Sequence, residues 1–582
     1  MRRLALVLVV VGGCATGQQS ITKIVNGRII STRAVTPSAY EHVSRALVYE
    51  EEERWSDAAA ELQRALVYDN EAPELQAHLA EVFIRLDRLD DAEAAVQASL
   101  AQGETADGLI AGGHLRQLRG DPAGAVASFE RATRLVSLSE DGAQAENAYL
   151  ELGDAALVAL DVAKAREAFA RLCDGAPESL TGRLRLAALA WAMGDVGETE
   201  RRLKEALVEE PNQLDALLTL GALYTATGRM PQARARYAEA LDRSEGAPEI
   251  VTAYARFLIA AGDRKEAEQL AEDQPAIDPK DGDALGKRLE LERTAKRYDR
   301  ALALLKAAEQ GDVPDELKAR LPLLRAQVLA DQGKRTEAVQ SLLGVGKEAT
   351  GRLEARLQAA EILREDGKGA EAARALGESE VEAGEGDRPD IELAVGRALA
   401  DERRGDSARA VRWLEEALGR HPDSPRVILT LAALEERRGQ WKRALELAEK
   451  VLAKEPGSVE ALNFWGFVAA DHGYDLGRAV KRLVSALALD AGTGSIIDSV
   501  GWAHLKSGDL PRAALFLEQA ARLEPTDPEV LSHVGELYVR RSEPERAAGI
   551  FRKALEHKPE DALRRRLEEE LTRLESRKAA RP

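Results

Sequence analysis

The sequence predicts an all-α solenoid built from helix-turn-helix repeats, and three observations support this fold class. First, alanine recurs at an interval of 34 residues, as at Ala233, Ala267 and Ala301. Second, prolines share that interval, as do Pro525 and Pro559. Third, the composition is 45% hydrophobic and 31% charged with only 4% aromatic residues, which suits continuous helix. A fixed period of this length indicates units that each bury an apolar face against their neighbours.

The first segment, residues 1–13, has the pattern of a signal peptide. A basic start precedes an apolar run, residues 4–11, that is too short to span a bilayer. The residues Val11-Gly12-Gly13-Cys14 resemble the lipobox of bacterial lipoproteins. This resemblance implies cleavage before Cys14 and lipid on its thiol and new amino group. An ordinary secretory signal with an incidental cysteine is the alternative.

Residues 14–38 are interpreted as a lipidated N-terminus and tether, because they show no clear helical period. Several acyl chains on Cys14 would anchor the protein stably to a membrane. Ala15 stands where aspartate commonly retains lipoproteins at the inner membrane, so the resemblance implies the periplasmic face of the outer membrane. With Cys14 lipidated, Cys173 has no intramolecular partner, and we expect it to be a buried thiol rather than part of a disulfide.

One unit of the repeat, residues 214–247, shows why helix pairs are expected. Two apolar stripes have helical spacing, and Gly228 breaks the helix between them. The stripes consist of Leu217, Leu220, Gly221 and Tyr224, then Ala233, Tyr237, Ala240 and Leu241. Gly221 and Ala233 are small, which we expect where two helices cross closely.

This arrangement resembles the tetratricopeptide repeat, which has a small residue at position 8, tyrosine at 11, alanine at 20 and 27, and proline at 32. The unit that ends at Pro559 matches through Gly535, Tyr538, Ala547, Phe551 and Ala554. We expect roughly 15 such units between residues 39 and 561. The resemblance implies a right-handed superhelix whose first helices line a concave side, and a chain that binds other proteins.

Two features subdivide the array. The period lengthens within a Gly/Glu-rich run, residues 377–389, which we interpret as a flexible joint between an N-terminal array, residues 39–376, and a C-terminal array, residues 390–561. A longer surface loop explains this run equally well. Residues 562–582 mix arginine and glutamate and are predicted to form the polar capping helix and tail that a solenoid end requires. A docking helix is the alternative for this last segment.

Charge and motifs argue against several functions. The formal net charge of -19 argues against nucleic-acid binding, which needs a basic stripe. We find no HExxH, GxSxG or Walker motif, so we expect no enzymatic activity, no cofactor and no small-molecule substrate. His472, His504 and His533 occupy different positions in successive units, so we expect no shared metal site. Protein partners and a membrane anchor are the contacts that remain.

A partner site is suggested by the C-terminal array. The stretch from Asn463 through Asp471 and on to Asp498 and Trp502 resembles a signature of bacterial envelope repeat proteins. Some of those are outer-membrane lipoproteins that recruit a carboxyl-terminal processing protease and its cell-wall hydrolase substrates. The resemblance implies that Asn463, Asp498 and Trp502 face the groove, as contacts or as local caps and braces. Trp502 is the strongest candidate, as an exposed aromatic, and Trp191 is a similar candidate in the N-terminal half.

These observations favour a non-enzymatic adaptor: a lipid-anchored scaffold that holds a periplasmic protease or another envelope enzyme together with its substrate. The alternative is a structural component of an outer-membrane export, polysaccharide-secretion or motility complex. A third hypothesis, an enzyme, has no motif to support it.

Overall fold

The computed structural model describes residues 20–25, 28–33, 36–278, 280–311, 313–346, 352–377, 387–403, 405–490, 494–557, 559 and 561–579. The predicted signal peptide and Cys14 lie outside the described residues, as do residues 378–386 of the expected joint. The chain divides into two compact units, residues 1–155 and 156–582, and the boundary lies within a helix.

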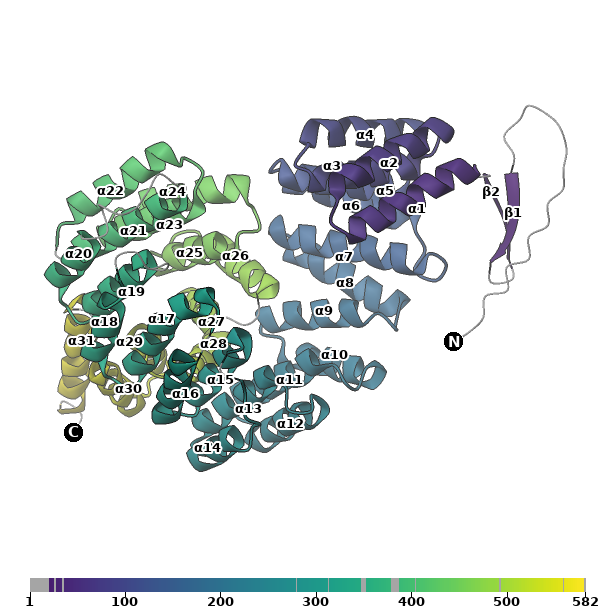
Figure 1. Cartoon of the computed structure of the whole chain (residues 1–582). Helices are drawn as coiled ribbons and strands as arrows, with labels where there is room; N and C mark the ends of the chain where they lie inside the picture. The colour runs from purple at the N-terminus through teal and green to yellow at the C-terminus, as the bar shows by residue number, and fades with distance from the viewer. Residues whose placement is uncertain are drawn as a thin grey trace. The chain divides into compact units, whose positions relative to one another are not determined.

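The first unit holds a β-hairpin and the first helices (Figure 1): β1 (Ser20–Val25), β2 (Arg28–Arg33), α1 (Pro37–Glu51), α2 (Trp55–Tyr68), α3 (Pro73–Arg85), α4 (Leu89–Gln102), α5 (Ala106–Leu118), α6 (Pro122–Leu135) and most of α7 (Gly142–Val158). The two strands are antiparallel, and Ser20 pairs with Arg33. This hairpin was not predicted from the sequence, and it lies within the segment interpreted as a tether.

The second unit holds the remaining helices: α8 (Val162–Gly175), α9 (Leu180–Ala192), α10 (Val196–Glu209), α11 (Leu214–Ala226), α12 (Met230–Arg243), α13 (Pro248–Ala261), α14 (Arg264–Glu272), α15 (Gly282–Thr294), α16 (Tyr298–Gln310), α17 (Asp315–Asp331), α18 (Arg335–Leu343), α19 (Arg352–Glu365), α20 (Gly369–Gly377), α21 (Asp387–Arg403), α22 (Ser407–Arg420), α23 (Pro425–Arg437), α24 (Trp441–Lys454), α25 (Val459–Asp471), α26 (Leu476–Leu489), α27 (Gly494–Ser507), α28 (Leu510–Leu523), α29 (Pro528–Arg540), α30 (Pro544–Glu556) and α31 (Asp561–Ala579). Odd-numbered helices from α9 to α29 open the pairs, and even-numbered helices close them. The predicted all-α solenoid of helix pairs is confirmed.

Local chemistry explains where the second helix of a pair begins. In several pairs an aspartate caps it, because the carboxylate accepts a hydrogen bond from a backbone N–H that has no partner inside the helix. These caps are Asp121, Asp161, Asp195, Asp406 and Asp509. The turn before the cap contains a residue with positive φ, often a glycine because glycine adopts this conformation without a steric penalty.

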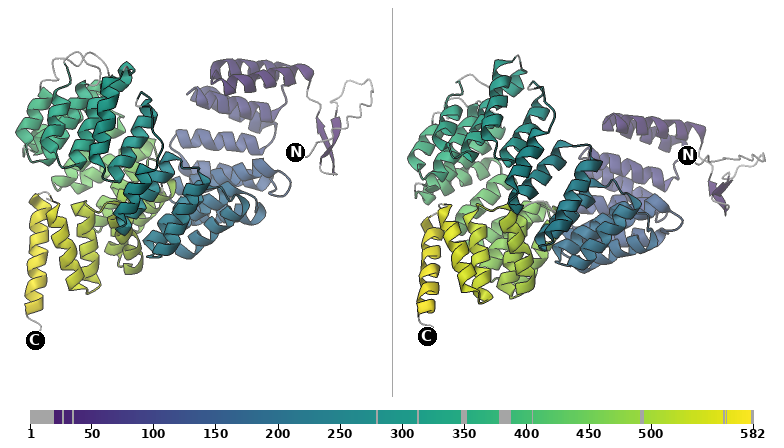
Figure 2. Two further views of the ribbon diagram at one scale, coloured as in Figure 1. Left: turned by 60° about the horizontal axis from the view of Figure 1, so that its bottom comes forward. Right: turned by 90° about the horizontal axis from the view of Figure 1, so that it is seen from below.

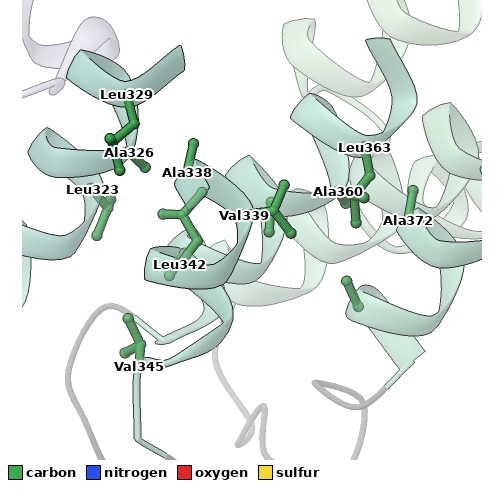
Figure 3. Packing of buried hydrophobic residues seen from close by; sticks show 13 residues of the cluster. Leu323, Ala326, Leu329, Ala338, Val339, Leu342, Val345, Ala360, Leu363 and Ala372 are labelled. Carbon is green, nitrogen blue, oxygen red and sulfur yellow. The ribbon is translucent and has the colours of Figure 1, made fainter. Parts of the chain in front are cut away.

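Small residues allow the two helices of a pair to approach closely. A Cβ atom on Gly221 would lie 2.8 Å from the ring of Tyr237, and one on Gly501 would lie 2.7 Å from Leu517. The expectation that Gly221 marks a helix crossing is therefore confirmed. Between the pairs, alanine, leucine and valine form hydrophobic clusters, and Figure 3 shows the one that extends from Leu323 to beyond Leu363.

The second unit also coils back on itself. Helix α26 packs against α9, and α28 packs against α11, although these helices are far apart in the sequence (Figure 2).

Cys173 is buried as expected, and burial raises the pKa of its thiol to about 11. Among the described helices, none is both long enough and apolar enough to cross a membrane.

Candidate functional site

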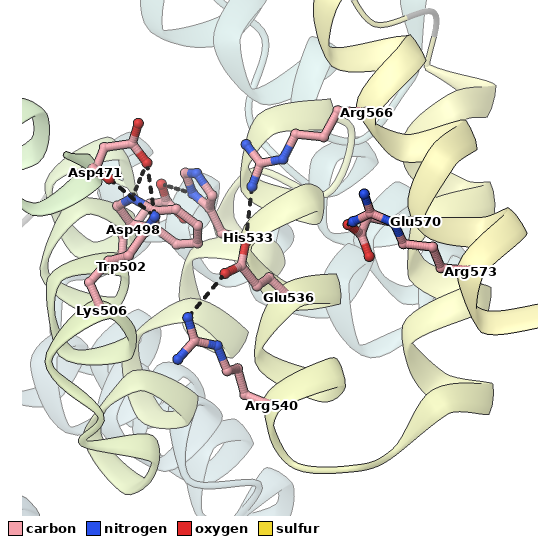
Figure 4. Close-up of polar contacts among 10 residues, drawn as sticks. All are labelled: Asp471, Asp498, Trp502, Lys506, His533, Glu536, Arg540, Arg566, Glu570 and Arg573. Atoms are coloured by element: carbon pink, nitrogen blue, oxygen red, sulfur yellow. Dashed lines mark hydrogen bonds and ion pairs between the residues drawn. The ribbon is translucent and has the colours of Figure 1, made fainter. Parts of the chain in front are cut away.

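A buried polar cluster joins the first helices of three successive pairs, α25, α27 and α29 (Figure 4). The Trp502 indole N–H donates a hydrogen bond to Asp471 Oδ1 over 3.1 Å. Lys506 Nζ lies 3.3 Å from the same oxygen and 4.4 Å from the centre of the Trp502 ring. The ammonium therefore neutralises the carboxylate and packs over the indole face, which carries partial negative charge.

The second part of this cluster is an ion pair between Asp498 and His533. His533 Nδ1 lies 2.7 Å from Asp498 Oδ2, and the His533 ring stacks on Trp502 with 4.0 Å between ring centres. Burial alone would lower the pKa of His533, but the charge and hydrogen bond of Asp498 raise it above its ordinary value. The pair therefore bridges α27 and α29 inside the protein.

The structure places the signature residues inside this cluster rather than on an open groove surface. The Trp502 side chain is 0% exposed and Asp498 is 5% exposed. The expectation of an exposed aromatic at Trp502 is therefore wrong, because α29 covers the ring through His533. Asn463 is half-buried, and its Oδ1 is buried without a hydrogen-bond partner in the described part of the chain. A contact between these residues and a partner stays a prediction.

Trp191 already has an aromatic neighbour, and that neighbour belongs to the same chain. The Trp191 side chain is 5% exposed and meets the Phe516 ring edge-on, with 5.5 Å between ring centres. Phe516 lies on α28, more than 300 residues further along the chain. Trp191 therefore packs against another part of its own chain. Its contact with a partner protein stays a prediction.

A hollow in the second unit was not anticipated from the sequence. It has a volume of about 430 Å³ and lies across the first helices of three pairs, α13, α15 and α17. The lining is mostly polar, with arginine, carboxylate and amide groups beside the partly buried Leu324. The lining residues are Arg256, Gly286, Leu289, Glu290, Arg293, Thr294, Leu324, Gln327 and Asp331.

Gly286 in the middle of α15 opens this hollow. A Cβ atom added there would meet nothing within 4 Å, whereas one on Gly501 would collide with Leu517. Close helix packing therefore does not explain Gly286, although glycine inside a helix costs roughly 0.5–1 kcal/mol relative to alanine. The sequence did contain a signal, since Gly286 falls outside the small crossing position of its unit.

Two ion pairs across the walls balance the charge of the hollow. Arg256 Nη2 lies 3.2 Å from Glu290 Oε1, and Arg293 Nε lies 2.6 Å from Asp331 Oδ2. The carboxylates are thus engaged, while Arg256 keeps further N–H groups directed to solvent, since its side chain is 56% exposed. Unused donors in this region suit a ligand that presents hydrogen-bond acceptors, such as backbone carbonyls.

The histidines singled out in the sequence contact different carboxylates. His472 lies 3.6 Å from Glu436, and His504 lies 3.8 Å from Asp509. Across the described residues, no group of three or more histidine, cysteine or acidic side chains is arranged to hold a metal ion.

Comparisons with known proteins identify the repeat along much of the chain. Two models of the tetratricopeptide repeat match it, one at residues 190–239, 228–289 and 402–464 and the other at 43–107, 111–179 and 501–562. Together these segments cover more than half of the chain. A tetratricopeptide-repeat-containing protein of Pseudomonas aeruginosa, PA4667, is 27% identical over 186 residues. That match covers 32% of this chain and 30% of the relative, so it spans less than a third of the relative's length.

Two solved structures are among those similar to this chain. Yeast Tom70 is 13% identical with a TM-score of 0.38, over 75% of this chain and 96% of Tom70. The Cut9 complex with Hcn1 from the APC/C is 15% identical with a TM-score of 0.34, over 92% of this chain and 96% of that one.

Proposed function

The chain belongs to the tetratricopeptide-repeat family, and from that premise we propose that it is a scaffold that holds an extended segment of a partner protein in the hollow above Gly286. Repeats of this family are protein-interaction modules that stack to form long binding surfaces. The observation that carries the proposal is the hollow that α13, α15 and α17 line together, with Gly286 on its wall.

The dimensions and chemistry of the hollow support this occupant. Its volume of about 430 Å³ falls within the range of ligand pockets, roughly 300–1,000 Å³. A partner side chain would rest above Gly286, beside the partly buried Leu324. Arg256 and Thr294 would donate hydrogen bonds to the partner backbone. The balanced charge of the walls favours a segment with little net charge.

The signature residues support a second, indirect role in the same function. Because Asp498 and Trp502 are buried, we propose that they hold α25, α27 and α29 in register. Lys506 and Asp471 are the partly exposed members of this cluster, with side chains that are 21% and 35% exposed. Substitutions at the buried members would weaken binding through loss of local structure.

The place of action is part of the proposal. The lipobox-like residues up to Cys14 support a lipid anchor, and Ala15 supports the outer membrane. The resemblance of residues 463–502 to envelope lipoproteins supports an adaptor that recruits a periplasmic processing protease and its cell-wall hydrolase substrates. The alternative partner class is the subunits of an export, polysaccharide-secretion or motility complex.

Site-specific crosslinking tests the proposed binding site. A photocrosslinking amino acid replaces Thr294 in the hollow, and the matched control carries it in place of Gly549, an exposed position on α30. We expect the Thr294 probe to join one protein in the native envelope, and mass spectrometry identifies it. A protease or hydrolase supports the adaptor, and a secretion subunit supports the assembly component. Equal crosslinking at both positions would contradict the binding site.

A further inference from the structure

Helix α1 exposes a position that is buried in later repeat units. Val48 is 50% exposed, and so is its neighbour Leu47. The residues that correspond to Val48 in later first helices recur at intervals near 34 residues and are at most 5% exposed. They include Val82, Leu115, Leu189, Leu223, Leu434 and Leu537. The first helix therefore presents apolar surface that the repeat unit normally covers.

The missing cover is a preceding second helix. Along the array, the second helix of one pair packs against the first helix of the next, as α2 does against α3 and α4 against α5. In the part of the chain that the structure describes, no helix precedes α1. We call the side of α1 that carries Glu41, Arg45 and Val48 its outer face. Glu41 and Arg45 pair with each other there, so the polar surface that a solenoid end requires is only partly provided.

The β-hairpin stands where that second helix would stand in the chain. Residues 34–36 join β2 to α1, and an equally short connection, residues 103–105, joins α4 to α5. Each strand has six residues and is about 20 Å long, whereas the 15 residues of α1 extend over about 22 Å. The hairpin can therefore lie along the whole of α1.

The composition of the hairpin complements that of α1. Residues 20–33 contain Lys23, Arg28 and Arg33 and no acidic residue, whereas residues 36–54 contain five glutamates and two arginines. Five isoleucine and valine residues complete the apolar part of the hairpin sequence. Because a two-stranded hairpin alone is only marginally stable in water, it gains stability from an apolar surface on which to pack.

We propose that the hairpin packs on the outer face of α1 around Val48 and caps the N-terminal end of the array in place of a second helix. The hairpin then belongs to the array and not to a tether. With an anchor at Cys14, residues 15–19 would be the whole connection to the membrane, at most about 18 Å long. That consequence rests on the proposed anchor, whereas the packing rests on neither the anchor nor the hollow above Gly286.

Photocrosslinking in the full chain tests the contact. A photocrosslinking amino acid replaces Val48, and the matched control carries it in place of Val208, a 79% exposed valine on α10. We expect the Val48 probe to form an intramolecular crosslink to residues 20–33, identified by mass spectrometry, and the Val208 probe to form none with that segment. A crosslink from Val48 to a second copy of the chain would overturn the proposal, and so would equal crosslinking of the hairpin from both positions.

Amide hydrogen exchange provides a second readout. Val48→Lys places a positive charge against the basic hairpin and removes an apolar contact, so the amides of residues 20–33 should exchange at least about tenfold faster than in the wild-type chain. Val208→Lys, the matched control, should leave their exchange unchanged. Circular dichroism verifies that both variants keep their helices.

A further variant leaves α1 intact. Lys23→Glu combined with Arg28→Glu should also prevent the Val48 probe from crosslinking to the hairpin, because the opposite charges that favour the contact are lost. Unchanged crosslinking in this variant, together with equal exchange of residues 20–33 in the wild-type chain and Val48→Lys, would refute the proposed packing.

Discussion

Trp502 gives the sharpest test of whether the signature residues stabilise the fold or contact a partner. Its side chain is completely buried, bonded to Asp471 and stacked on His533. Trp502→Ala should therefore cost about 3–5 kcal/mol, the usual range for a large aromatic replaced by alanine in a core. Trp502→Phe keeps most of the packing and loses one hydrogen bond to the half-buried Asp471, so it should cost about 0.5–1.5 kcal/mol.

The assay is urea denaturation followed by far-ultraviolet circular dichroism, with amide exchange of α25 to α29 as a local readout. The local readout matters because repeat arrays can unfold in segments. Tyr40→Ala is the control, since that aromatic side chain lies on α1 and is 69% exposed. If Trp502→Ala unfolds like the control yet loses partner binding, Trp502 is a contact residue and the argument from burial fails.

Three further predictions concern protonation and packing. Burial lowers the pKa of His504 from 6.5 to about 4, so protonation favours the unfolded chain. The free energy of unfolding should therefore decline as pH falls from 6.5 towards 4, by roughly 3 kcal/mol at most. His504→Leu should flatten this part of a plot of the urea midpoint against pH. For His114 the pKa shifts in the opposite direction, because hydrogen bonds and charge from Glu151 and Glu81 outweigh burial and raise its pKa to about 10. Its contribution to stability is complete below pH 6.5 and is lost as pH rises through 10. Histidine NMR should show a charged ring at pH 8. Gly501→Ala should destabilise by about 1–3 kcal/mol despite better helix propensity, because its Cβ would collide with Leu517; a higher melting temperature would refute the packing argument.

Much of the fold could be predicted from the sequence because the relevant interactions are local. The 34-residue period indicates which helix faces are buried within a repeat unit and between adjacent units. Gly221 could be predicted as a helix-crossing residue from its position in the unit alone. The β-hairpin was missed although Asn26-Gly27 stands between two runs rich in β-branched residues, which is a sequence signal of a hairpin. A helix period carries no information about such a segment.

The candidate site was harder to predict because it depends on contacts that spacing does not encode. Trp502 occupies a groove-facing position in its own unit, but whether the next helix covers it depends on the particular side chain there, which is His533. The partner of Trp191 lies on α28, and that contact requires the rotation accumulated over many units. Gly286 stands out only when the empty space around it is known.

The measurement that tests the central claim most directly is the affinity of the identified partner for Gly286→Leu, compared with Gly549→Leu. A Cβ atom added at either glycine would meet nothing within 4 Å, so both substitutions should raise helix stability by about 0.5–1 kcal/mol. Only the first fills the hollow. The account predicts that Gly286→Leu raises Kd at least about tenfold while Gly549→Leu leaves it unchanged. Equal affinities for the wild-type chain and both variants would contradict it.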